Sequence, residues 1–268
     1  MKIKLIILLL LVGVSIPLFS SAGHRLLSLF EERGGGGVPE DWEGIRRVAQ
    51  AGSGEAQFQL GAMYHQGDGV PQNYEEALKW YRLAAEQGNA NAQTNLGWMY
   101  DKGEGIAKDY GMAAAWFRKA AEQGDAQAQF NLGLMYDKGE GIPKDYQQAV
   151  FWYRQAAEQG MAGAQNILGL MYDKGDGVEQ NYVEAVKWYR KAAEQGDINA
   201  QIFLGLMYEN GDGVSPDLVK AHMWLDLAAA KGNINAVIGR DNIATQMTAT
   251  QIAEAKSLAA RWQPTRQP

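Results

Sequence analysis

Residues 128–163 have the sequence AQFNLGLMYDKGEGIPKDYQQAVFWYRQAAEQGMAG, one of five similar 36-residue units that follow each other without insertion or deletion. The units cover residues 56–91, 92–127, 128–163, 164–199 and 200–235. Five residues of the third unit stand at the same position in every unit: Ala128, Gly133, Tyr136, Trp152 and Gly160. Repetition at a fixed period of this length is typical of solenoid proteins, in which each unit packs only on its neighbours.

Each unit has the pattern of two helices joined by a glycine-rich loop. In the first unit the apolar spacing predicts helices over residues 54–66 and 74–87. Gly67 is expected to end the first helix, and Asn73 to cap the second. Gly61 lies inside the first helix, where glycine costs about 0.5–1 kcal/mol relative to alanine. A Trp or Tyr ring of the facing helix is expected to occupy the space left by the missing Cβ. The sequence therefore predicts an all-α fold, an α/α solenoid of antiparallel helix pairs.

The segments on either side of the units have the pattern of capping elements. Residues 39–55 repeat part of the second helix of a unit, since Ala49 aligns one period before Ala85, and predict a degenerate N-terminal capping helix. Residues 236–268 predict C-terminal capping helices and a tail. Residues 23–38 contain four successive glycines and predict a flexible linker.

The first 22 residues have the pattern of a secretory signal peptide. Lys2 and Lys4 precede an apolar run from Leu5 to Phe19, and small residues up to Ala22 follow. We therefore expect export and cleavage, with the protein periplasmic or secreted. An uncleaved anchor is the alternative and the only membrane contact that the sequence suggests. A lipid anchor on cysteine is excluded because the chain contains no Cys.

The composition argues against several classes of function. A net charge of -6 without a basic stripe does not fit a nucleic-acid binder. The absence of cysteine removes thiol nucleophiles and thiolate metal sites. The loop that begins at Asp173 resembles a calcium loop, but Gly175 and Gly177 stand where ligands are required. The three histidines, His24, His65 and His222, are far apart in a stacked array. We therefore expect no cofactor, no metal and no catalysis.

Positions of the first helix that vary between units predict a binding groove, because the repeated frame does not fix them. They form a mainly apolar stripe flanked by charged residues, with Trp98 where later units have leucine. The candidate groove residues are Phe58, Trp98, Phe130, Leu134, Leu170, Phe203, Leu206, Lys102, Lys138 and Lys174. Packing between neighbouring first helices is an equally good explanation of the leucines. Phe151 and Met223 mark a rival surface on the second helix.

The unit pattern AQxxLGxMYxxGxGVxxxYxxAxxWYRxAAEQG resembles Sel-like repeats, relatives of the tetratricopeptide repeat. The resemblance covers residues 56–235 and implies a right-handed α/α superhelix whose concave groove is lined mainly by the first helices. It also implies a non-catalytic adaptor that binds a protein or peptide partner, often outside the cytoplasm. Some cysteine-rich members are linked to β-lactam binding or hydrolysis, which leaves β-lactams or peptidoglycan fragments as an alternative ligand class. Self-association without a groove ligand is a third alternative.

Overall fold

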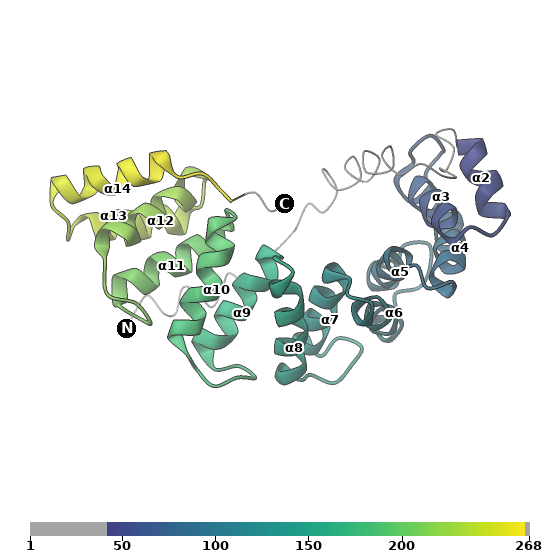
Figure 1. The fold of residues 1–268 in the computed structure, drawn as a ribbon, viewed down its shortest axis with the longest axis horizontal. Coiled ribbons are helices and arrows are strands. Elements are labelled where there is room, and N and C mark those ends of the chain that lie inside the picture. Colours follow the sequence, from purple (N-terminus) through teal and green to yellow (C-terminus); the bar gives the residue numbers. More distant parts are fainter. Residues whose placement is uncertain (1–41, 266–268) are drawn as a thin grey trace.

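The computed structural model describes residues 42–265, and every regular element in this range is a helix. The repeated units supply α3 (Gly54–Gln66), α4 (Tyr74–Glu86), α5 (Ala90–Lys102), α6 (Tyr110–Glu122), α7 (Ala126–Lys138), α8 (Tyr146–Glu158), α9 (Ala162–Lys174), α10 (Tyr182–Glu194), α11 (Ile198–Asn210) and α12 (Leu218–Ala230). They are flanked by α2 (Trp42–Gln50), α13 (Ile234–Ala244) and α14 (Ala249–Arg261). Each helix from α2 to α13 packs against the next, and the stack bends into an arc (Figure 1). The all-α solenoid prediction is confirmed.

Each unit begins and ends its helices with the residues that the pattern indicates. In the third unit Asp125 caps α7 by accepting from the Ala128 amide at 2.6 Å, and Asp145 caps α8 by accepting from the Gln148 amide at 3.0 Å. Gly139 ends α7 with a φ of 75°, in the left-handed region that only glycine adopts without strain. Short capped turns of this kind place successive helices antiparallel and adjacent.

The glycine inside each first helix provides the space for a large side chain from the second helix. A Cβ built at Gly61 would lie 2.6 Å from Cδ1 of Tyr81. The residues in the place of Tyr81 in the later units are Phe117, Tyr153, Tyr189 and Leu225, and each one approaches the equivalent glycine in the same way. The prediction that a Tyr ring fills this space is therefore confirmed. The repeated Trp does not fill it, since Trp80 packs in a cluster with Ala49, Ala56 and Leu60.

Buried glutamines connect three successive helices. Gln129 of α7 is 4% exposed; its Nε2 donates to the Ala121 carbonyl of α6 at 3.1 Å, and its Oε1 accepts from Gln159 of α8 at 2.8 Å. The equivalent bonds form around Gln57, Gln93 and Gln165. A buried amide is stable only when it is hydrogen-bonded, so this ladder fixes how each unit docks on the preceding one.

The two ends of the array differ from its middle. At the N-terminal end, α2 covers α3 and buries Ala49. At the C-terminal end, α14 begins with a capping box between Thr248 and Gln251 and packs chiefly on α12, where Trp262 meets Trp224 edge to face at 6.2 Å. The expected signal peptide and linker lie outside the described residues.

Candidate protein-binding groove

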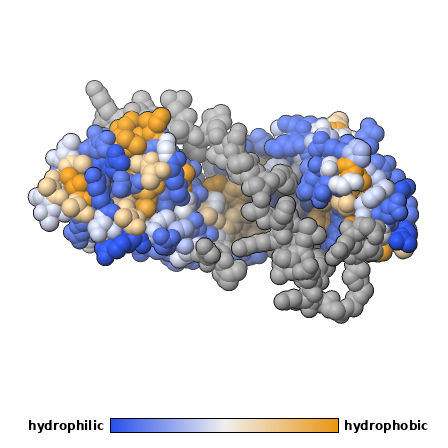
Figure 2. Space-filling model, turned by 90° about the horizontal axis from the view of Figure 1, so that it is seen from above, coloured by the Kyte–Doolittle hydropathy of each residue, from blue (hydrophilic) through white to orange (hydrophobic). Residues whose placement is uncertain are grey.

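The first helices of the central units line the inner side of the arc. In Figure 1, α5 and α7 lie on that side, and α6 and α8 lie on the outer side. Figure 2, which looks onto the open side of the arc, shows apolar surface in the hollow between the two ends. The first helices that carry the variable positions thus lie, in the central units, on the inner side of the arc.

The aromatic residues predicted for the groove all pack against large side chains of the second helices. Phe58 lies 5.9 Å from Tyr81 between ring centroids, and Trp98 meets Phe117 edge to face at 5.7 Å. Phe130 lies 5.8 Å from Tyr153, and Phe203 stacks on Tyr189 at 5.1 Å. The supporting rings of Tyr81, Phe117, Tyr153 and Tyr189 are 0–2% exposed. Well-packed supports hold the groove aromatics in fixed positions.

The predicted groove residues differ in how much surface they present. Phe58, Trp98 and Phe203 are half-buried, as are Leu134, Leu170 and Leu206. Phe130 is only 8% exposed, because it is enclosed by Tyr153 and the neighbouring helix at Gly163. Phe130 therefore offers little surface to a partner.

The apolar candidates pack on different core clusters. Phe58 and Trp98 pack on the cluster of the first units, Leu134 on that of the third and fourth units, and Leu170 and Phe203 on that of the fifth. Packing within the array therefore accounts for part of the apolar stripe, as the sequence allowed for the leucines.

Charged side chains border the apolar stripe. The ammonium nitrogen of Lys102 lies 5.1 Å from the Trp98 ring centroid, within cation–π range, and 2.8 Å from the carboxylate of Asp101. Lys138 and Lys174 are exposed at the equivalent places in the next two units. The three lysines therefore stand at equivalent, exposed positions of three successive units.

Carboxylates of successive units meet along the same border. Burial raises the pKa of Asp137, and the nearby Asp176 carboxylate of the next unit raises it further, although Lys144 opposes this. Burial also raises the pKa of Glu209. At the N-terminal end the pattern changes, since His65 takes the place of the acid and pairs with Glu104 of the second unit at 2.9 Å. The border of the groove is therefore mixed in charge.

The histidines and acidic residues of the described range were the candidates for a metal centre. Between residues 42 and 265, no group of three or more His, Asp or Glu side chains is placed to hold a metal ion. His222 is 2% exposed in α12, where burial lowers its pKa, whereas His65 lies in α3 at the other end of the array.

Two features of this region escaped the sequence analysis. The glutamine ladder and the contact of Arg118 with the Tyr136 hydroxyl, at 2.7 Å, both tie neighbouring units together. The sequence contains a pattern for both contacts, because Gln129, Arg118 and Tyr136 recur with the 36-residue period. Their partners also recur in most units. A polar residue that repeats at a buried helix position indicates a hydrogen bond that repeats with it.

Helix pairs that stack in this way define a helical repeat protein of the α/α solenoid class. The Sel1 repeat model matches residues 54–89, 90–125, 126–161, 162–197 and 198–233, two residues earlier than the boundaries drawn from the sequence. The chain belongs to the Sel1 repeat family. Proteins of this family are generally protein-interaction scaffolds.

Two solved structures show the same architecture. A protective antigen present in uropathogenic Escherichia coli strains, which displays an SLR fold, is 37% identical with a TM-score of 0.76, over 83% of this chain and 49% of that chain. The chain thus spans about half the length of that antigen. A Sel1 repeat protein from Oxalobacter formigenes is 35% identical with a TM-score of 0.68, over 90% of this chain and 95% of that chain. No curated protein matches the chain. Among residues 42–265, no helix has the length and apolar character needed to cross a membrane.

Proposed function

We propose that this protein is an exported, non-catalytic adaptor that binds a segment of a partner protein along the inner side of the arc. The single observation that carries the proposal is the environment of Trp98. Its ring is half-buried, is held edge-on by the buried Phe117, and has the Lys102 ammonium 5.1 Å from its centroid. Three later units have leucine at this position, so the array does not need a Trp there.

A rigid, half-buried Trp with some accessible surface is the kind of residue that dominates binding energy at interfaces. Hot spots are enriched in Trp and lie where neighbouring groups exclude water. Here the Phe117 ring fixes one side of the indole and leaves part of it available. A partner residue that covers the remaining surface would bury apolar area at little cost in side-chain entropy.

The rest of the stripe suits an elongated partner segment. Leu134, Leu170 and Leu206 continue from Trp98, one per unit, and Phe203 adds a ring that is stacked on Tyr189. Each lysine on the border stands next to an acid in the chain, as Lys102 stands next to Asp101. An apolar floor with a mixed charged rim fits an extended or helical peptide that carries apolar anchors and charges of both signs.

The test compares partners recovered from the cell envelope fraction by wild type, Trp98→Ala and Phe151→Ala. Phe151 is the matched control, since it is an aromatic residue, 50% exposed on α8 of the outer side. Loss of a hot spot costs about 2 kcal/mol or more, so Trp98→Ala is expected to weaken partner binding by about 30-fold or more. Phe151→Ala should recover the same partner at wild-type strength. Equal recovery by all three proteins would show that the groove assignment is wrong.

Export is the second part of the proposal and rests on the sequence of residues 1–22, which lie outside the described range. The intact mass of the protein, purified from the cell that expresses it, should correspond to a chain that begins at Gly23. A mass that retains Met1 would instead support an uncleaved anchor.

The alternative of β-lactam or peptidoglycan-fragment chemistry finds no support in the described residues. The chain has no Cys, which the family members linked to β-lactams are rich in. Purified protein is expected to leave the chromogenic β-lactam nitrocefin unhydrolysed above the buffer rate. Turnover that scales with protein concentration would instead support β-lactam hydrolysis.

A further inference from the structure

Each end of the array carries one half of an incomplete repeat unit. At the N-terminal end, α2 stands in the place of a second helix: Gln57 donates to the Ala49 carbonyl at 3.1 Å, just as Gln93 donates to the Ala85 carbonyl at 3.1 Å. At the C-terminal end, α13 stands in the place of a first helix, since Asn233 caps it through the Ala236 amide as Asn89 caps α5. The N-terminal end is therefore formed by a second helix, and the C-terminal end by a first helix.

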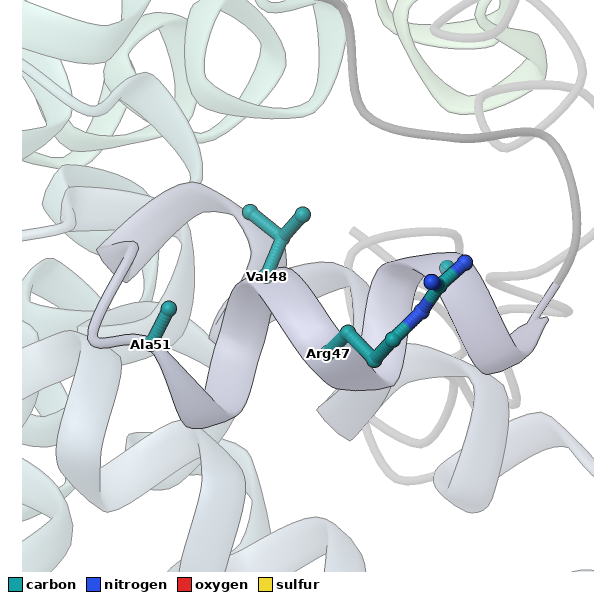
Figure 3. Close-up of a pocket in the computed structure, with 4 residues that line it drawn as sticks. Arg47, Val48 and Ala51 are labelled. Atoms are coloured by element: carbon teal, nitrogen blue, oxygen red, sulfur yellow. The ribbon is translucent and has the colours of Figure 1, made fainter.

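The side of α2 on which a first helix would pack is only partly exposed, since Gly44 is buried, Val48 is half-buried and Ala51 is exposed. Its residues Gly44, Val48 and Ala51 correspond, one period earlier, to Trp80, Ala84 and Gln87. Trp80 clusters with Ala56 and Leu60 of the first helix in its own unit, and Gln87 bonds to Gln57 of that helix at 2.6 Å. At the same place on α2 there is an open pocket, lined by Gly44, Arg47, Val48 and Ala51 (Figure 3). These four residues are called the head face.

The exposed side of α13 is the side on which a second helix would pack. Ile234 and Ile238 are 73% and 54% exposed, although they lie one helical turn apart on the same face. They correspond to Gly54 and Phe58, which pack against Gln87 and Tyr81 of the second helix in their own unit. Among residues 42–265 no such helix covers them, because α14 packs chiefly on α12. Ile234, Ile238 and Asp241 are called the tail face.

We propose that the tail face of one copy of this chain docks on the head face of a second copy, so that α13 and the partner's α2 together complete one repeat unit. Superposing the repeat places Ile234 against Ala51, as Gly54 lies against Gln87, and Ile238 against Ile45, as Phe58 lies against Tyr81. The pocket left open by Gly44, where other units have Trp, receives the branched side chains. Burial of exposed isoleucine surface provides the driving force.

The order of helices in the array favours this arrangement over tail-to-tail docking. In every unit a first helix packs on a second helix, and only the head face presents a second helix to the tail face. Asp241 stands at the position of Gly61 in a regular unit, and the residue at the position of Tyr81 on the head face is the shorter Ile45. Asp241 pairs with Arg240 of its own helix at 2.8 Å, so the tail face presents a neutral pair at this place. A contact between two different faces leaves one head face and one tail face available on each dimer, so further copies can add to it.

Sedimentation velocity of the purified protein tests the proposal, in a concentration series that reaches about 1 mM because so small a contact binds weakly. The weight-average sedimentation coefficient of wild type should rise with concentration without a plateau at the dimer. A tail-blocked variant, Ile234→Lys with Ile238→Lys, and a head-blocked variant, Ala51→Lys with Arg47→Glu, should each remain monomeric. Phe151→Lys, an exposed change on the outer side of α8, should behave as wild type.

Mixing the two blocked variants separates this arrangement from the others. Each retains one intact face, so the mixture should form dimers and nothing larger. Two results would overturn the proposal: a wild type that stays monomeric throughout the series, as expected if residues 23–38 of the same chain cover the head face, or a head-blocked variant that dimerises alone through two tail faces. All substituted residues are surface residues, and unchanged thermal unfolding of each variant excludes misfolding as the cause. The proposal is independent of the groove, since Trp98→Ala should not alter association.

Discussion

Tyr81 occupies the space in which any side chain at Gly61 would have to lie, because a Cβ at that position would be 2.6 Å from Cδ1 of the ring. The same relationship joins Gly97 to Phe117, Gly133 to Tyr153 and Gly169 to Tyr189. The two helices of a unit can therefore approach only where the first helix has no side chain. A glycine that costs helix stability locally is retained because the packing of the unit depends on it.

Gly133→Ala tests this relationship directly. The added Cβ would lie 2.8 Å from Cδ1 of the buried Tyr153, so overpacking should lower the free energy of unfolding by about 1–3 kcal/mol. The control is Gly163→Ala in α9, where the added Cβ would lie 3.7 Å from Cε2 of Phe130, an ordinary contact. That change should be neutral or stabilising by up to about 1 kcal/mol, because alanine favours the helix. Denaturant unfolding of both variants measures the difference, and similar effects would refute the packing argument.

Gln129→Leu tests the glutamine ladder. The change removes the donor to the Ala121 carbonyl and the acceptor for Gln159, and a buried polar group left without a partner costs about 1–3 kcal/mol. Gln147→Leu, an exposed change on α8, should stay within about 0.5 kcal/mol of wild type. Urea unfolding followed by circular dichroism gives both values. A neutral Gln129→Leu would mean that the ladder does not stabilise the stack.

The raised pKa of Asp137 predicts that the stability of the protein depends on pH. Its pKa is raised in the folded protein, chiefly by burial, so the folded state holds the proton more tightly than the unfolded chain does. The free energy of unfolding therefore falls as pH rises from the ordinary carboxyl range through the raised value. Asp137→Asn should raise the melting temperature at neutral pH, and the gain should shrink as the pH falls through the raised pKa, where the wild-type carboxyl becomes protonated. Glu158→Gln, an exposed change on α8, is the control and should show no such trend. A gain from Asp137→Asn that is independent of pH would contradict the assignment.

Trp98→Leu separates binding from folding at the groove. Leucine occupies this position in the third, fourth and fifth units, so the array accommodates it. Loss of the contact with Phe117 should cost about 1 kcal/mol of stability. Partner affinity should fall at least about tenfold, because leucine does not replace the indole surface at a hot spot. Calorimetric titration with the partner found in the envelope fraction measures the affinity, and an unchanged value would remove Trp98 from the binding surface.

Much of this fold could be predicted from the sequence because each unit meets the same neighbours. Ala56, Gly61 and Gly67 have the same roles in every unit, so their recurrence revealed helix boundaries, turns and the buried side of each helix. The candidate site was less accessible, since it consists of positions that do not recur. Phe130 and Trp98 both look like surface aromatics in the sequence, yet neighbouring α9 lacks a side chain at Gly163 and lets Phe130 become enclosed.

The sequence by itself determined the period, the helix pairs and the caps, because these depend on residues within about one unit of each other. Only the tertiary structure decided which ring fills the space at Gly61, which groove residues keep exposed surface, and that α14 turns onto α12 and leaves Ile234 and Ile238 uncovered. These features depend on distances between helices of different units. Repetition specifies such distances where the array continues and leaves them open where it ends.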